Sequence, residues 1–158
     1  MLNPAELTTE RRIGDPAVVS SVALLPWLFL FVTLVADRLV DDPTAKAGKT
    51  LTMATFVGAS ALCILGPLTL VALIGAIALQ QHNFRVGLWF TRVAATTATL
   101  FCAVLTVAFM SDAFGSSQLR DDWHPSHSPP ATLLIVAPHF VVGLANAYVL
   151  VRLSKRGA

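Results

Sequence analysis

Four long apolar segments constrain this chain more than any other feature of its sequence. They run approximately over residues 17–36, 51–79, 86–110 and 131–153, and none of them contains an Asp or Glu. Each is long enough to cross the hydrocarbon core of a bilayer as a helix, which takes about 20 residues. Hydrophobic residues make up 55% of the 158 residues and charged residues only 13%, whereas a soluble domain carries about 25% charged residues. The sequence therefore predicts an all-α integral membrane protein, a four-helix transmembrane bundle of two hairpins that forms a single domain over residues 1–158.

The connections between these segments are short. We expect a tail over residues 1–16 on one side of the membrane. Two connections, over residues 37–50 and 111–130, should lie on the opposite side. A tight link should join the second and third spans on the same side as the tail. The second apolar segment is longer than a bilayer requires, so it should tilt or bend. Gly66-Pro67 is the expected place for a bend, because Pro lacks the backbone donor that a helix interior uses.

The first apolar segment follows Arg11-Arg12, as the apolar region of a cleaved signal peptide would. Two features favour a retained span instead. Acidic residues dilute the positive charge before it, and the apolar run is longer than the 7–15 residues of a typical signal peptide.

The distribution of Lys and Arg predicts the orientation. Seven of these residues lie on one side, in the tail, in the tight link, at the C-terminal end and at Arg92 shortly after the link, and four lie in the two other connections. Positive charge accumulates on the cytoplasmic side of membrane proteins. We therefore expect a multi-pass protein of the cell membrane, inner or plasma, with both termini in the cytoplasm.

Small residues recur at helical spacing on two of the predicted spans. The third span carries Thr91, Ala95, Ala98, Cys102 and Thr106 on one face, and the fourth carries His139, Gly143 and Ala147 at intervals of four, with Asn146 beside them. Helices in a bilayer associate where small side chains let their backbones approach closely. We predict that these two faces pack against each other and close the bundle.

His139 is the strongest candidate for a functional residue, because an ionisable side chain deep in a bilayer is expensive to keep there. Three roles remain open for it: a packing residue whose neutral ring is hydrogen-bonded to a Thr or backbone carbonyl of a neighbouring span, a proton or substrate site, or a ligand for haem or another metal. No second His lies at that depth to complete a haem site with two axial His ligands. Asn146, on the same stripe, is either a donor to a substrate or part of a hydrogen bond between helices.

The connection over residues 111–130 contains a weak candidate metal site, made of Asp121, Asp122, His124 and His127. Carboxylates and imidazoles are ligands of Zn and Cu. Their spacing matches no known motif, however, and a solvated acidic loop explains the same residues. Arg92, near one end of the third span, is either an anion-binding residue or a side chain that extends to the membrane surface.

Several classes of function are disfavoured. A net charge of +2 without a run of Lys and Arg gives no reason to expect nucleic acid as a partner. Both Cys residues fall within apolar segments and no CxxC spacing is present, so we predict neither a disulfide framework nor a cofactor. No glycine-rich phosphate loop, nucleophile elbow or zinc-protease motif is present, and no motif is specific enough to assign a family.

Three hypotheses of different classes remain. The first is a non-enzymatic accessory, assembly or scaffold component, with the lipid bilayer and either a second copy of the chain or another membrane protein as partners. The second is a small transporter or efflux subunit, which would lack a carboxylate proton site within its spans. The third is a membrane-embedded enzyme that acts on a lipid- or quinone-like substrate with His139 as general acid or base. The sequence favours the first because it contains no catalytic constellation.

Overall fold

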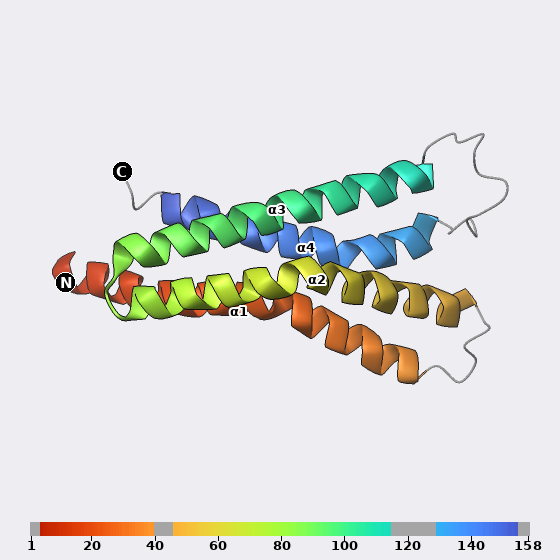
Figure 1. Cartoon of the computed structure of the whole chain (residues 1–158), viewed down its shortest axis with the longest axis horizontal. Coiled ribbons are helices and arrows are strands. Elements are labelled where there is room, and N and C mark those ends of the chain that lie inside the picture. The colour runs from red at the N-terminus through yellow and green to blue at the C-terminus, as the bar shows by residue number, and fades with distance from the viewer. Residues whose placement is uncertain (1–3, 40–45, 115–128, 155–158) are drawn as a thin grey trace.

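The computed structural model describes residues 4–39, 46–114 and 129–154, and within these ranges the chain forms four helices and no strand. The helices are α1 (Pro4–Arg38), α2 (Lys46–Gln80), α3 (Phe84–Phe114) and α4 (Pro129–Ser154) (Figure 1). Each contains a stretch long and apolar enough to span a bilayer. The all-α, four-span prediction is therefore confirmed.

The helices extend beyond the apolar segments. α1 already begins at Pro4, within the expected tail, and α2 begins at Lys46, within the expected connection over residues 37–50. Once a helix has formed, each further residue adds one backbone hydrogen bond without a new nucleation cost. α1 and α4 both begin with Pro, whose missing N–H is harmless in the first turn. α2 continues through Gly66 and Pro67 without a break.

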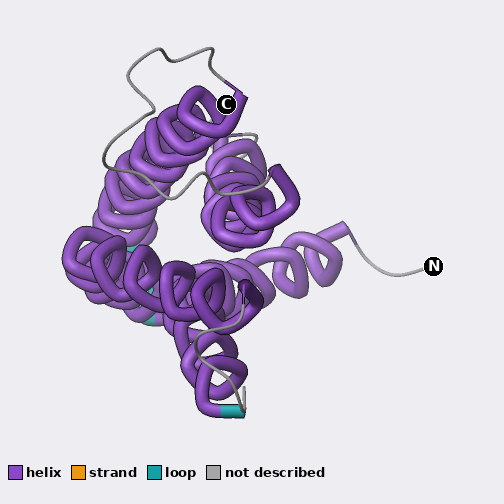
Figure 2. Tube along the Cα trace, turned by 90° about the vertical axis from the view of Figure 1, so that its right-hand side faces the viewer, coloured by secondary structure: helices purple, strands orange, loops and turns teal. Residues whose placement is uncertain are grey.

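Neighbours in the sequence are neighbours in the bundle and run antiparallel. α1 packs along α2, α2 along α3 and α3 along α4, while α4 touches α1 over a shorter stretch. The start of α1 and the end of α4 lie at the same end of the bundle, which we call the terminal end; the opposite end, where α1 finishes, is the far end (Figure 1). The helices are inclined to one another in the end view, and α1 and α2 diverge toward the far end (Figure 2).

A tight turn at the terminal end joins α2 to α3. The amide of His82 donates to the carbonyl of Leu79 at 3.3 Å, and the amide of Asn83 donates to that of Ala78 at 2.9 Å. These two bonds make a Schellman motif, whose central residue adopts a left-handed conformation. His82 has a φ of 60° and occupies the position that usually belongs to Gly. The motif provides partners for carbonyls at the end of α2 and reverses the chain within three residues.

Small side chains are frequent in the described interior, and many large ones lie on the outside. Ala accounts for much of the buried core, at Ala23, Ala54, Ala61, Ala76, Ala94, Ala95 and Ala98. In contrast, Leu100, Val104 and Val107 on α3 are 62%, 68% and 64% exposed. A soluble protein would bury such residues, but lipid solvates them, so the core is free to use residues that allow close helix contact.

Two backbones approach each other closely between α2 and α3, at a contact that we call the glycine seam (Gly75, Gly87 and Thr91). A Cβ atom at position 75 would lie 2.5 Å from Thr91 Oγ1 and 3.1 Å from the carbonyl oxygen of Gly87. A Cβ atom at position 87 would lie 2.7 Å from Leu79 Cγ. Both positions therefore require Gly for steric reasons.

Gly75→Ala should lower the free energy of unfolding by about 1–3 kcal/mol, because the added methyl group overpacks the seam and forces α2 away from α3. The matched control is Gly66→Ala, where a Cβ would lie 3.6 Å from Trp27 Cζ2 in ordinary contact. That control should be neutral or stabilising by up to about 1 kcal/mol, since Ala is the better helix former. Unfolding in detergent micelles followed by circular dichroism measures both; equal effects would contradict the seam.

Candidate functional site

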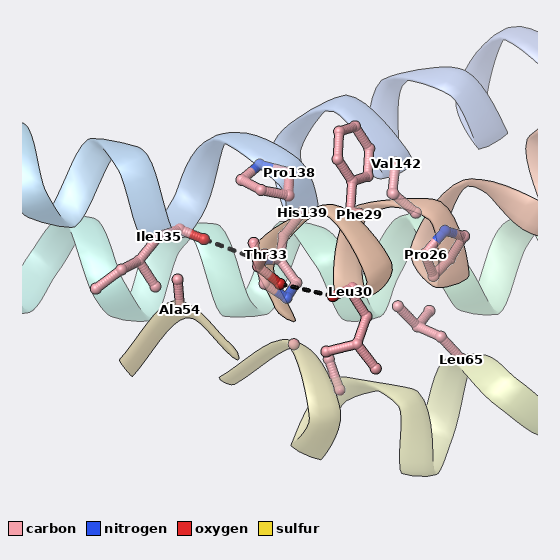
Figure 3. A pocket seen from close by; sticks show the side chains of 12 residues that line it. Pro26, Phe29, Leu30, Thr33, Ala54, Leu65, Ile135, Pro138, His139 and Val142 are labelled. Atoms are coloured by element: carbon pink, nitrogen blue, oxygen red, sulfur yellow. Dashed lines mark hydrogen bonds between the residues drawn. The ribbon is translucent and has the colours of Figure 1, made fainter. Parts of the chain in front are cut away.

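A pocket lies between α1, α2 and α4 in the half of the bundle nearer the far end. Its volume is about 400 Å³, including space open to the outside, and about 30 Å³ of it can hold the centre of a water molecule. The side chains around it are apolar except for Thr33 of α1 and His139 of α4 (Figure 3). The full lining is Pro26, Phe29, Leu30, Thr33, Ala54, Gly58, Ala61, Leu65, Ile135, Pro138, His139 and Val142.

The side chain of His139 is buried, at 8% exposed, and no other His of the described residues is buried. Its Nδ1 lies 3.2 Å from the carbonyl oxygen of Ile135, one turn earlier in α4. We expected a packing histidine to bond to a neighbouring span, but this hydrogen bond stays within its own helix. The ring thus satisfies one nitrogen locally and contributes no hydrogen bond between helices among the described residues.

Asn146 behaves in a similar way. Its Nδ2 donates to the carbonyl of Val142 at 2.9 Å, again within α4, so the expected bond between helices is replaced by a local one. Asn146 lines a second, smaller pocket together with Thr69 and Ala98, and His139 does not line that pocket. The structure therefore places the two polar candidates in different pockets, two turns of α4 apart, and does not bring them together in one site.

The predicted small-residue seam is divided between two interfaces. Gly143 of α4 faces α3, since a Cβ atom there would lie 3.1 Å from Cys102 Cβ. Thr91, at the other end of the same face of α3, meets Gly75 of α2. Ala95, Ala98 and Cys102 are all buried, and Ala147 is half-buried. The small face of α3 thus packs against both of its neighbours, because it is inclined between them.

Sequence reasoning missed the hydrogen bond that links two helices in the interior. Thr69 Oγ1 lies 3.0 Å from the carbonyl oxygen of Ala23 in α1 and 2.9 Å from that of Leu65 in its own helix. A hydroxyl shared in this way is a common local partner for Thr in helices. The signal available in the sequence was a Thr near the middle of a long span, two residues after Pro67.

Arg92 lies near the terminal end and is exposed. Its Nη2 donates to the carbonyl oxygen of Leu153, in the last turn of α4, at 3.2 Å. A cation at that position pairs with carbonyls that have no partner within the helix. The side chain therefore binds the end of α4, a contact that neither of the two expected roles included.

The weak metal candidates Asp121, Asp122, His124 and His127 lie outside the described residues. Within residues 4–39, 46–114 and 129–154, no group of three or more His, Cys, Asp or Glu side chains is placed to hold a metal ion.

Comparison with known proteins adds no assignment: no protein-family model, no curated protein and no solved structure matches this chain.

Thr69→Val should lower the free energy of unfolding by about 0.6 kcal/mol, the average for hydrogen bonds between helices in a bilayer, and by no more than about 1.7 kcal/mol, the largest value found for such bonds. Thr99→Val is the matched control, because Thr99 Oγ1 donates only to Ala95 of its own helix, at 2.7 Å. We expect the control to change stability by less than half as much. Unfolding titrations in the same micelles measure the difference, and a larger loss for Thr99→Val would contradict the role given to Thr69.

Proposed function

We propose that this protein is a non-enzymatic component of the membrane, an accessory, assembly or scaffold subunit. One observation carries the proposal. Four polar side chains are buried in the described interior, at Thr69, Thr91, Thr132 and His139, and none of them hydrogen-bonds another side chain of the described residues. A general acid, general base or nucleophile normally works with an orienting partner. Among the described residues, His139 has only the backbone carbonyl of Ile135 as a partner and no side chain of another catalytic type.

The outer surface supports the same proposal. Large apolar side chains of α1 face outward, including Leu28, Phe31 and Val32, which are 54%, 64% and 53% exposed. Such a surface suits contact with lipid and with neighbouring membrane proteins. As partners we propose the bilayer together with a second copy of the chain or another membrane protein.

A carrier is the second candidate, and the pocket beside His139 is the observation that favours it. A carrier coupled to protons needs a titratable group that is reachable from both sides of the membrane. The pocket approaches only the half of the bundle near the far end, and no carboxylate is among the buried residues described. For these reasons we rank the carrier below the scaffold.

Extraction of the native membrane into polymer-bounded lipid particles, followed by native mass spectrometry, tests the scaffold proposal. We expect particles in which the 16.8 kDa chain is present with further copies or with another membrane protein at a fixed ratio. A scaffold acts by binding other proteins, so particles that contain a single copy of the chain and no other protein would contradict the proposal.

Proteoliposomes loaded with a pH-sensitive dye test the carrier, the alternative to the scaffold. Protein-dependent proton flux that is lost in His139→Gln, while the variant still folds, would replace the scaffold with the carrier. Flux equal to that of protein-free vesicles agrees with a scaffold.

We also propose that the terminal end faces the cytoplasm of a cell whose plasma or inner membrane holds the protein. The count of Lys and Arg supports this orientation. Arg85 and Arg92 lie at that end of α3, and Arg152 lies at that end of α4.

Two exposed positions test the orientation, one in the first turn of α2 and the other just after its last residue. A membrane-impermeant maleimide should label Lys49→Cys in intact cells and should label Gln81→Cys only after permeabilisation. The wild-type chain is the control, because exposed Cys63 lies within the apolar part of α2 and Cys102 is buried. The reverse labelling pattern would show the opposite orientation.

A further inference from the structure

The hydrogen bond of His139 leaves one of its ring nitrogens without a described partner. A carbonyl oxygen can only accept, so the contact with Ile135 places a proton on Nδ1. In the neutral ring, Nε2 is then an acceptor with a free lone pair. His139 is more than nine-tenths buried and lines the pocket between α1, α2 and α4, whose other lining residues are apolar except for Thr33.

No side chain in the lining can donate to that acceptor. Thr33 is the one other polar side chain there, and its single hydroxyl proton already goes to the carbonyl oxygen of Leu30 at 3.0 Å (Figure 3). The remaining lining residues are apolar, and their backbone donors are used within helices. Ligand pockets combine apolar walls with a few polar groups that orient the ligand, and an acceptor without a donor in such a pocket is a position at which a donor of the ligand can bind.

The shape of the cavity follows from the residues that surround it. Ala54 and Gly58 of α2 are too small to fill the space, and the Cβ that Gly58 lacks would lie 3.5 Å from Leu30 Cδ1, without a clash. Pro26 and Pro138 contribute their rings from α1 and α4. The cavity is partly open at the surface of the bundle, so a molecule dissolved in the bilayer has a route into it.

We propose that this cavity binds a small apolar molecule that carries one hydroxyl group, of the phenol or hydroquinone class, with the hydroxyl donating to His139 Nε2. The apolar walls match a hydrocarbon ring, and the one donor of the ligand matches the one free acceptor of the site. A single water molecule is the competing occupant. Water needs two to four polar partners, and this cavity offers the minimum of two, Nε2 and the oxygen of Thr33, so the two occupants are told apart by the response of Nε2 to a probe that carries a hydroxyl group. The proposal is independent of the scaffold role, because a ligand of this kind can bind to a subunit that performs no chemistry on it.

Two probes that differ only at the hydroxyl test the proposal on the wild-type chain. The protein, with ¹⁵N-labelled histidine, is placed in phosphatidylcholine nanodiscs and titrated with 4-methylphenol or with 4-methylanisole. We expect the Nε2 resonance of His139, assigned by its loss in His139→Gln, to move saturably with 4-methylphenol and to stay in place with 4-methylanisole. The resonance of exposed His82 serves as the internal reference for nonspecific effects of the probe.

A second variant tests the cavity without changing the histidine. Gly58→Val places a side chain inside the pocket and should weaken binding of 4-methylphenol at least tenfold. Phe140→Leu, on the lipid-facing side of α4 next to His139, should leave binding unchanged. The proposal is overturned if the resonance fails to move with 4-methylphenol or moves equally with both probes, since water would then be the partner of Nε2. It is also overturned if Gly58→Val, shown to be folded by circular dichroism, binds the probe as tightly as the wild-type chain.

Discussion

Backbone hydrogen bonding inside an apolar solvent is the constraint on which this structure depends. The hydrocarbon core of a bilayer supplies no partner for an N–H or C=O group, so each span must satisfy its own backbone. Helices do this without help from another segment, and the described chain is almost entirely helical as a result. The same constraint explains the one tight turn that is described, where the Schellman motif at His82 and Asn83 gives partners to carbonyls at the end of α2.

Association of the helices has a different physical origin. Lipid solvates Leu and Val as well as a protein core does, so burial of large side chains gives little drive for packing. The helices associate instead where their backbones approach each other closely. This occurs at the glycine seam between α2 and α3, and between α4 and α3 where Gly143 meets Cys102. Ala is the commonest residue of the described core, where it packs beside larger side chains such as Val142, Leu153 and Ile135, while many other Val, Leu and Phe side chains face outward.

Several polar side chains of this interior form hydrogen bonds with carbonyls of their own helix. His139, Asn146 and Thr99 each bond to a carbonyl one turn earlier. Thr69 alone among the buried polar residues reaches the backbone of another described helix. A local bond of this kind satisfies a single polar group, so an imidazole with two nitrogens keeps one of them for an additional partner. The cavity beside His139 lies where such a partner would have to bind.

The amino-acid sequence by itself determined the number of spans, their approximate limits and the helical class, because these depend on the length and polarity of each segment alone. It also indicated that Gly143 and the small residues of α3 would be packing positions. Only the tertiary structure decided which neighbour each small residue meets, since the inclination of α3 divides one face between α2 and α4. It also decided that His139 and Asn146 lie in separate pockets and that Thr69 links α2 to α1. Helical periodicity fixes the face on which a residue lies, whereas the partner of that face depends on how whole helices cross.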